Sequence, residues 1–355
     1  MMTGRPKGFL HWLRREWPKF RMRHIDRGRL RRPGNTLVVE STNVCTLHCS
    51  CCPNGVDRDT LRPRATLTLA SFREILPNLD IIPENIFLHL HGEPLLNRDL
   101  PEIAAELQRR GARKFTMFSN AQKVDTDVLD RLLTLTPGAE WKVGFSMEIF
   151  SPRLYEATRC GGRHADALES LDRIDAVMAR HGIDYTINAI IDAEAVEEAR
   201  ARAKEIFSRY SRLGDIGFSN RFPWPHLPQT GDLIGTLRPH ANICSQLWDL
   251  PAVTASGDVT LCSSDYRGEA VVGNLHDAPY SRLINNAAAR RFRLNLALRR
   301  PERNAMCRGC LIPRFTQFQR TLTRKFALSG SEENLKRYFD SFLPHLNRGK
   351  EVENG

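Results

Sequence analysis

The chain has 355 residues, of which 41% are hydrophobic and 26% charged, so it can bury a full core. This composition excludes a disordered chain and predicts one large domain with one or two smaller ones. No run of about 18 uncharged apolar residues occurs, and the N-terminus lacks an unbroken apolar stretch, which argues against a membrane span or a cleaved signal. We therefore expect a cytoplasmic protein.

Most of the positive charge lies in an N-terminal arm. The net charge is +11, and residues 1–35 carry eleven Lys or Arg against two acidic residues, so the rest of the chain is nearly neutral. Phe9, Leu13 and Trp17 have the spacing of one face of a short amphipathic helix. Such an arm could contact the inner face of a membrane or bind an acidic partner, and a solvated tail is the alternative.

Short apolar runs then alternate with amphipathic stretches, which predicts repeated βα units around a parallel sheet. We expect strands at residues 37–40, 86–90, 115–119, 141–147, 185–191 and 216–219. We expect helices at residues 69–79, 99–109, 126–135, 165–180 and 195–210. Six units are too few for a closed eight-stranded barrel, so the α/β fold expected is a partial (β/α)6 barrel with its active site at the C-terminal strand ends.

A Pro-rich segment at residues 222–228 ends the alternation of strands and helices and predicts a domain boundary. The expected division is a basic arm at 1–35, the barrel at 36–222, a small auxiliary domain at 223–318 and a C-terminal helical tail at 319–355. Residues 253–255 and 259–261 flank Ser-Gly-Asp, which predicts a hairpin, and helices are expected at 281–298 and 332–342.

Four of the nine cysteines, Cys45, Cys49, Cys51 and Cys52, lie in one loop after the first strand. Cys45, Cys49 and Cys52 have the spacing C-x3-C-x2-C, and three thiolates so close together can hold three irons of a [4Fe–4S] cluster. The fourth iron is then open to a ligand, whereas zinc would prefer four protein ligands. A reducing compartment argues against disulfides.

This loop resembles the triple-cysteine signature of the radical SAM superfamily, and the resemblance extends over about residues 36–320. It implies that S-adenosylmethionine (SAM) chelates the open iron through its amino and carboxylate groups. An electron from the cluster then yields methionine and a 5′-deoxyadenosyl radical. Cys51 departs from the family, which usually has a bulky residue before the last cysteine. A small buried thiol or an alternative ligand is the expected role of Cys51.

The segment that ends the second strand resembles the G-G-E-P motif of the same family. Gly92, Glu93 and Pro94 are kept, and the resemblance implies that they bind the SAM amino group, with glycine allowing close approach of the backbone. His91 replaces the first glycine. A metal site formed by His89 and His91 is the alternative interpretation.

Polar residues also follow the third and fourth strands, where the family contacts the SAM ribose. The implied ribose contacts are Ser119, Asn120, Ser146 and Glu148. Arg159 matches the arginine that pairs with the SAM carboxylate. The adjacent Cys160 is either a hydrogen donor to a substrate radical, as in some radical epimerases, or a structural cysteine.

The four remaining cysteines of the C-terminal part form a second candidate ligand set: Cys244, Cys262, Cys307 and Cys310. Four thiolates make a complete set for one cluster. The pattern resembles the twitch domain, a shortened SPASM domain with one auxiliary [4Fe–4S] cluster. A structural zinc site is the alternative.

A fully ligated cluster cannot bind substrate but can accept an electron, so we expect oxidation, or epimerisation, of a sugar-like or aminocyclitol-like molecule or envelope precursor. A radical SAM enzyme that modifies ribosomal peptides is the alternative. A zinc protein bound to nucleic acid is a distant third, because the basic arm adjoins a nearly neutral body. The resemblance also implies an electron donor such as flavodoxin or ferredoxin.

Overall fold

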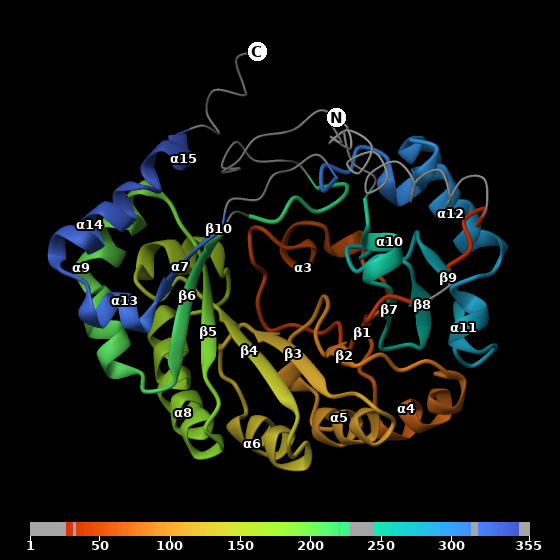
Figure 1. The fold of residues 1–355 in the computed structure, drawn as a ribbon, viewed down its shortest axis with the longest axis horizontal. Coiled ribbons are helices and arrows are strands. Elements are labelled where there is room, and N and C mark those ends of the chain that lie inside the picture. Colours follow the sequence, from red (N-terminus) through yellow and green to blue (C-terminus); the bar gives the residue numbers. More distant parts are fainter. Residues whose placement is uncertain (1–25, 31–32, 220, 228–243, 314–318, 348–355) are drawn as a thin grey trace, which may run out of the picture.

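The computed structural model describes residues 26–30, 33–219, 221–227, 244–313 and 319–347, and the predicted arm helix around Leu13 lies outside this set. Ten strands of the described residues form one curved sheet, in the order β10-β6-β5-β4-β3-β2-β1-β7-β8-β9 (Figure 1). Helices line its outer side, as a partial barrel requires.

The six central strands run parallel to one another, which confirms the partial barrel predicted from the alternating pattern. They are β1 (Thr36–Val39), β2 (Asn85–Phe87), β3 (Lys114–Ser119), β4 (Glu140–Ser146), β5 (Tyr185–Ile190) and β6 (Leu213–Ser219). The second strand is shorter than predicted, because pairing stops at Phe87 and the segment that follows turns toward the cysteine loop.

The longer helices between the strands bury an apolar stripe against the outer face of the sheet. In α5, for example, Leu100, Ile103 and Leu107 are fully buried at helical spacing. The helices are α3 (Pro53–Val56), α4 (Leu69–Ile75), α5 (Leu100–Arg109), α6 (Thr126–Leu135), α7 (Pro152–Thr158), α8 (His164–His181) and α9 (Ala193–Arg209). Short 3₁₀ turns are η2 (Arg58–Thr60), η3 (Leu76–Asn78), η4 (Pro94–Leu96), η5 (Pro301–Arg303) and η6 (Ala305–Cys307).

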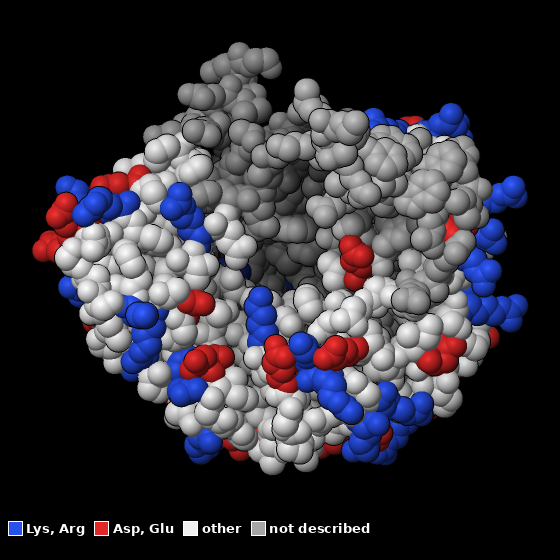
Figure 2. All heavy atoms as spheres, viewed as in Figure 1, with Lys and Arg blue, Asp and Glu red and all other residues white. Residues whose placement is uncertain are grey.

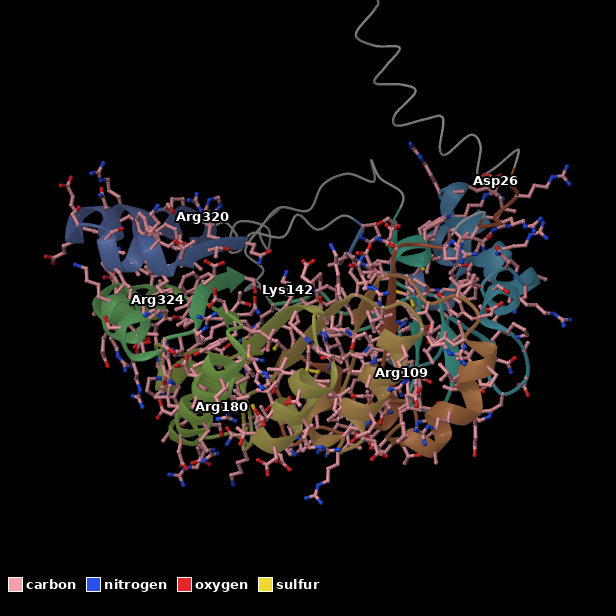
Figure 3. All side chains as sticks on the ribbon, turned by 60° about the horizontal axis from the view of Figure 1, so that its bottom comes forward. Asp26, Arg109, Lys142, Arg180, Arg320 and Arg324 are labelled. Atoms are coloured by element: carbon pink, nitrogen blue, oxygen red, sulfur yellow. The ribbon has the colours of Figure 1, made fainter. Side chains whose placement is uncertain are left out.

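The inner face of the sheet is open toward solvent. Side chains of a strand alternate between faces, and in β4 Val143 is buried in the core while Lys142 is exposed. Figure 3 shows Lys142 near the middle of the molecule, whereas Arg109 and Arg180 lie on the outer helices. Figure 2 shows a hollow near the centre of the viewed face. The concave side of the sheet can therefore receive ligands.

The auxiliary part continues the same sheet. Strand β7 (Ala252–Val253) pairs in parallel with β1, and β8 (Asp258–Thr260) and β9 (Val271–Asn274) follow antiparallel. The predicted hairpin is present, and Gly257 turns it with φ at +82°. The remaining helices are α10 (Gln246–Asp249), α11 (Tyr280–Leu283) and α12 (Ala287–Ala297). The helix expected at 281–298 is interrupted, because Asn286 caps α12 by accepting from the Ala289 N–H.

The C-terminal segment adds a strand that the sequence pattern does not predict. β10 (Gln319–Thr323) pairs antiparallel with β6 and covers that edge of the sheet. Helices α13 (Arg324–Ser329), α14 (Glu332–Asp340) and α15 (Leu343–Asn347) follow. Among the residues that the structure describes, we find no helix that is both long and apolar enough for a membrane span.

Candidate functional site

The loop after β1 holds the first cysteine set. Thr42 anchors it through a hydroxyl contact of 2.8 Å with Thr66, and the His48 N–H donates to the Cys160 carbonyl at 2.8 Å. Cys49 is buried, while Cys45 and Cys52 are half-buried. The loop is therefore tied to the segment around Thr66 and to the turn that follows α7.

The environment of these thiols suits a metal cluster. Burial raises the pKa of Cys49 to about 11, although Arg159 nearby lowers it, and burial raises the pKa of Cys52 to about 12. Nearby thiols raise both pKa values further, so these cysteines do not readily lose their protons when no cation is bound. A bound cation that replaces the protons stabilises the thiolates, which is the behaviour expected of a ligand set.

Gly92 lies directly against this loop. A Cβ atom there would be 2.3 Å from the Thr42 carbonyl oxygen and 2.7 Å from that of Val44, so only glycine fits. The next residue, Glu93, donates its N–H to the Val44 carbonyl at 2.9 Å. Pro94 is buried at the start of η4. The predicted G-E-P segment is thus joined to the cysteine loop by backbone contacts.

Glu93 is almost fully buried, with its carboxylate held by two backbone N–H groups. The Asn120 N–H donates to Oε2 at 2.7 Å and the Leu95 N–H to Oε1 at 3.1 Å. Burial nevertheless raises the pKa of Glu93 to about 7, and the two hydrogen bonds only reduce the size of this upward shift. A cationic or N–H-bearing ligand would favour the ionised form.

The end of β3 brings Asn120 to the cysteine loop. Its Nδ2 lies 3.6 Å from Cys45 Sγ, and its Oδ1 accepts from the Gln122 N–H at 2.7 Å. Ser119 is buried beside it. Ala121 and Lys123 both have positive φ, at 56° and 52°, so this turn has a strained backbone of the kind that clusters at functional sites. Sequence analysis did not single out Gln122, which accepts from the Tyr155 hydroxyl at 2.8 Å.

Arg159 and Glu148 form a buried ion pair. Arg159 Nη2 and Nε donate to the Glu148 carboxylate at 2.9 and 3.0 Å. Burial lowers the pKa of Arg159, but the Glu148 charge outweighs it and the net shift is upward. The charge of Arg159 also acts on Cys49 and Cys51, so the pair lies beside the cysteine loop.

The other predicted site residues lie near this pair. Ser146 ends β4 and pairs with Asn188 of β5. Cys160 is half-buried, with its Sγ 3.7 Å from the Ala157 carbonyl, and Cys51 has a raised pKa caused by burial. The structure therefore brings all the predicted SAM-site residues to the C-terminal ends of β1 to β4.

The second cysteine set lines a single cavity of about 220 Å³. Cys244, Cys262, Cys307 and Cys310 all contribute to its wall, although they come from three separate segments. Burial raises the pKa of Cys307 to about 12 and that of Cys310 to about 11. The rest of the wall includes apolar residues, among them Leu247, Leu296, Met306 and Ile312, together with Gln246, Arg299 and Glu302.

The spacing of the thiols bears on the type of metal centre. Among the described residues, no three His, Cys, Asp or Glu side chains are placed to hold one metal ion. A single zinc ion draws each sulfur to about 2.3 Å, whereas in a [4Fe–4S] cluster each thiolate binds its own iron. The cavity lined by four cysteines offers one thiolate for each of the four irons of such a cluster.

Glu40, Arg62 and His91 form a further cluster that sequence analysis missed. Arg62 binds the Glu40 carboxylate through both terminal nitrogens, at 2.9 and 3.0 Å, and approaches His91 Nδ1 at 3.0 Å. His89 is separate: its Nδ1 accepts from the Phe118 N–H at 3.3 Å, and burial lowers its pKa to about 4. Glu40 directly follows β1. Sequence analysis selected polar residues at the ends of the third and fourth strands, and the same criterion applied to the first strand would have found Glu40.

Comparison with known proteins agrees with this geometry. The family described as the radical SAM superfamily matches residues 39–201, and the family described as an iron-sulfur cluster-binding domain, SPASM, matches residues 244–311. No curated protein sequence matches the chain.

Solved structures share the fold at low sequence identity. BtrN in complex with AdoMet and 2-DOIA is 16% identical, with 80% of this chain and 99% of that chain covered and a TM-score of 0.52. Native anSMEcpe with bound AdoMet is 13% identical, with coverage of 89% and 99% and a TM-score of 0.53. Streptococcus suis SuiB bound to precursor peptide SuiA is 14% identical, with coverage of 81% and 72% and a TM-score of 0.54.

The chain belongs to the radical SAM superfamily and carries a C-terminal SPASM-like iron–sulfur domain. The resemblance stated from the sequence is thereby confirmed, as is the α/β fold. Its cofactors are SAM and [4Fe–4S] clusters, and the chain is a radical SAM enzyme.

Proposed function

We propose that this enzyme dehydrogenates a hydroxylated small molecule of the sugar or aminocyclitol type, with an auxiliary cluster as electron acceptor. The observation that carries the proposal is the cavity lined by Cys244, Cys262, Cys307 and Cys310. Four thiolates saturate one cluster, so substrate cannot coordinate it, and electron transfer is the function left to it. BtrN, solved with AdoMet and 2-DOIA, has a similar fold.

Within this proposal the first cysteine set, Cys45, Cys49 and Cys52, holds the cluster that binds SAM. When bound, this cluster and SAM supply the 5′-deoxyadenosyl radical. The residues of this chain bind and orient SAM: Gly92, Glu93 and Pro94 at the amino group, Arg159 at the carboxylate, and Ser119, Asn120, Ser146 and Glu148 at the ribose. Glu93, Pro94, Ser119, Asn120 and Glu148 are buried, and this burial excludes water from the reacting centre, which protects a radical from side reactions.

A peptide substrate is the second candidate. SuiB was solved with precursor peptide SuiA, and anSMEcpe was solved with the Cp18Cys peptide, both on a similar fold. An epimerase of either substrate class would use Cys160 as hydrogen donor. These candidates predict modification of a residue within a peptide, or a product isomeric with its substrate, and neither requires net oxidation.

The proposal is tested by anaerobic incubation of the reconstituted protein with SAM and dithionite, followed by measurement of 5′-deoxyadenosine. We expect 5′-deoxyadenosine to form. A double variant, Cys307→Ser with Cys310→Ser, should lose about four irons per chain, because one cluster loses two of its ligands. Cys160→Ser is the matched control and should keep its iron. Failure to form 5′-deoxyadenosine, or no loss of iron from the double variant, would refute the proposal.

A further inference from the structure

Each cysteine of the second set has an N–H donor at its sulfur atom. For three of them the donor is the backbone N–H of the residue two positions further along the chain. These pairs are Cys244 with Gln246, Cys262 with Ser264 and Cys310 with Ile312. For Cys307 the donor is a side chain, because Asn304 Nδ2 lies 3.8 Å from Cys307 Sγ. Of these four donors, a substitution can therefore remove only that of Asn304.

The amide group of Asn304 has a fixed orientation. Asn304 is only 3% exposed, its Nδ2 donates to the Phe292 carbonyl at 3.1 Å, and its Oδ1 accepts from Asn295 Nδ2 at 2.8 Å. A carbonyl oxygen can only accept, so the amide nitrogen, not the amide oxygen, must face Phe292. The second hydrogen of Nδ2 is then left for Cys307.

The backbone of Asn304 joins the donor to the cysteine turn. Asn304 directly precedes η6, and its carbonyl accepts from the Cys307 N–H at 3.0 Å and from the Arg308 N–H at 3.1 Å. Phe292 and Asn295, which hold the side chain, both belong to α12. The donor and the sulfur atom are therefore parts of one turn that is packed against a helix.

The hydrogen bond favours negative charge on the sulfur atom of Cys307. Burial raises the pKa of Cys307 to about 12, and the hydrogen bond from Asn304 acts in the opposite direction. The charge of Asp265 raises the pKa of Cys307 and of Cys262. Asn304 thus opposes both burial and a neighbouring carboxylate. Reduction of a cluster adds negative charge, and hydrogen bonds to its sulfur atoms help to set its reduction potential.

We propose that Asn304 raises the reduction potential of the auxiliary cluster by donating a hydrogen bond to the Cys307 thiolate, which makes the cluster a better electron acceptor. The inference rests on the proposed function, which assigns this cluster to the second cysteine set. In that reaction the C–H hydrogen atom goes to the 5′-deoxyadenosyl radical and the hydroxyl proton to solvent. The remaining electron goes to the oxidised auxiliary cluster, and a carbonyl group results.

The first test is a redox titration of the reconstituted holoenzyme, followed by electron paramagnetic resonance. The auxiliary cluster gives the signal that SAM leaves unchanged, because four thiolates leave none of its irons open. Asn304→Leu has a similar size but no donor. We expect it to keep its iron and its equilibrium constant for reduction to fall about tenfold, which is a midpoint potential about 59 mV lower. Asn334→Leu, at an exposed asparagine, is the matched control and should keep the wild-type potential.

A second variant acts on the orientation of the donor. Asn295→Leu leaves Asn304 in place but removes the group that donates to its Oδ1. We expect the potential to fall in the same direction by a smaller amount, because the amide is then held by fewer hydrogen bonds. If Asn304→Leu does not retain the auxiliary cluster, this milder variant decides the question.

A spectroscopic measurement separates the hydrogen bond from a packing role. The N–H hydrogens of Asn304 exchange in D2O, so electron–nuclear double resonance of the reduced auxiliary cluster should detect a coupled deuteron at this position. We expect the spectrum of Asn304→Leu to lack one coupled deuteron that the wild type shows. A residue that only fills space would leave the deuteron spectrum unchanged.

The outcomes distinguish the inference from the proposed function. A wild-type potential in a cluster-loaded Asn304→Leu, an unchanged potential in Asn295→Leu, or an unchanged deuteron spectrum in Asn304→Leu would each overturn the role of Asn304. The proposed function still stands in those cases, because the auxiliary cluster is present. If the wild type holds iron for one cluster only, the proposed function itself fails.

Discussion

The buried carboxylate of Glu93 gives a quantitative prediction for SAM binding. With a pKa of about 7, Glu93 is largely protonated in the SAM-free protein below neutral pH. Its proposed role is to accept a hydrogen bond from the SAM amino group, which requires the ionised form. The folded pKa lies above the usual 4.5, so ionisation costs free energy that grows as the pH falls below 7.

The size of the effect follows from the fraction of ionised Glu93. For a pKa of about 7, lowering the pH from 7.5 to 6 reduces this fraction about eightfold, and the dissociation constant for SAM should rise by the same factor. Equilibrium dialysis with radiolabelled SAM on anaerobic, cluster-loaded protein measures this dissociation constant at each pH. The amino group of SAM titrates between pH 7 and 8 by itself and adds to the dependence.

Glu93→Gln isolates the contribution of the carboxyl group. The variant cannot ionise at this position, so it should keep only the pH dependence of SAM itself. The ratio of its dissociation constant to that of the wild type should then shrink about eightfold between pH 7.5 and 6. Glu140→Gln, at an exposed position, is the control and should follow the wild type. A ratio that does not change with pH would refute the reasoning.

Three further predictions concern the same region. Gly92→Ala should destabilise the protein by about 1 to 3 kcal/mol in urea unfolding, because the new Cβ meets the Thr42 carbonyl; unchanged stability would contradict that contact. Glu40→Gln should cost about 3 to 5 kcal/mol at pH 7 because Arg62 stays buried and charged. This difference in free energy of unfolding between the wild type and the variant should disappear as the pH falls from about 4.5 towards 2, because Glu40 becomes protonated. A difference that persists at low pH would contradict the prediction. Arg159→Lys should weaken SAM binding about tenfold, because an ammonium cannot replace a forked guanidinium, and equal affinity would contradict this.

Local patterns predicted the central fold well. The six parallel strands and their helices follow from alternating and helical periodicity, which each segment carries by itself. The two additions to the sheet depend on tertiary pairing. In β10 only Leu322 is buried, so Gln319–Thr323 shows no apolar alternation and is held by its backbone ladder with β6. The β1–β7 pair likewise joins the barrel to the auxiliary part, across the boundary proposed near residue 222.

Some residues of the candidate site could likewise be recognised within one segment of the sequence, whereas others are brought together only by the fold. Cys45, Cys49 and Cys52 are recognisable because their spacing lies within one loop. The cluster of Glu40, Arg62 and His91 was missed because its members come from three segments, and only the fold brings Arg62 within 3.0 Å of both Glu40 and His91. The departure of His91 from the family glycine was the available signal, since a side chain placed where others have none changes the chemistry of the site.

The pairing of Arg159 with Glu148 joins two roles that sequence analysis had assigned separately. Arg159 uses Nε and one Nη2 hydrogen for Glu148, which leaves its other guanidinium hydrogens for the SAM carboxylate. Glu148 in turn accepts from Arg159 and from the Ile190 N–H at 3.3 Å, and a carboxylate has further lone pairs for a ribose hydroxyl. Because each residue orients the other, loss of Glu148 should disturb the carboxylate contact as well as the ribose contact. In the proposed mode of binding, one rigid unit would then contact both the carboxylate and the ribose of SAM.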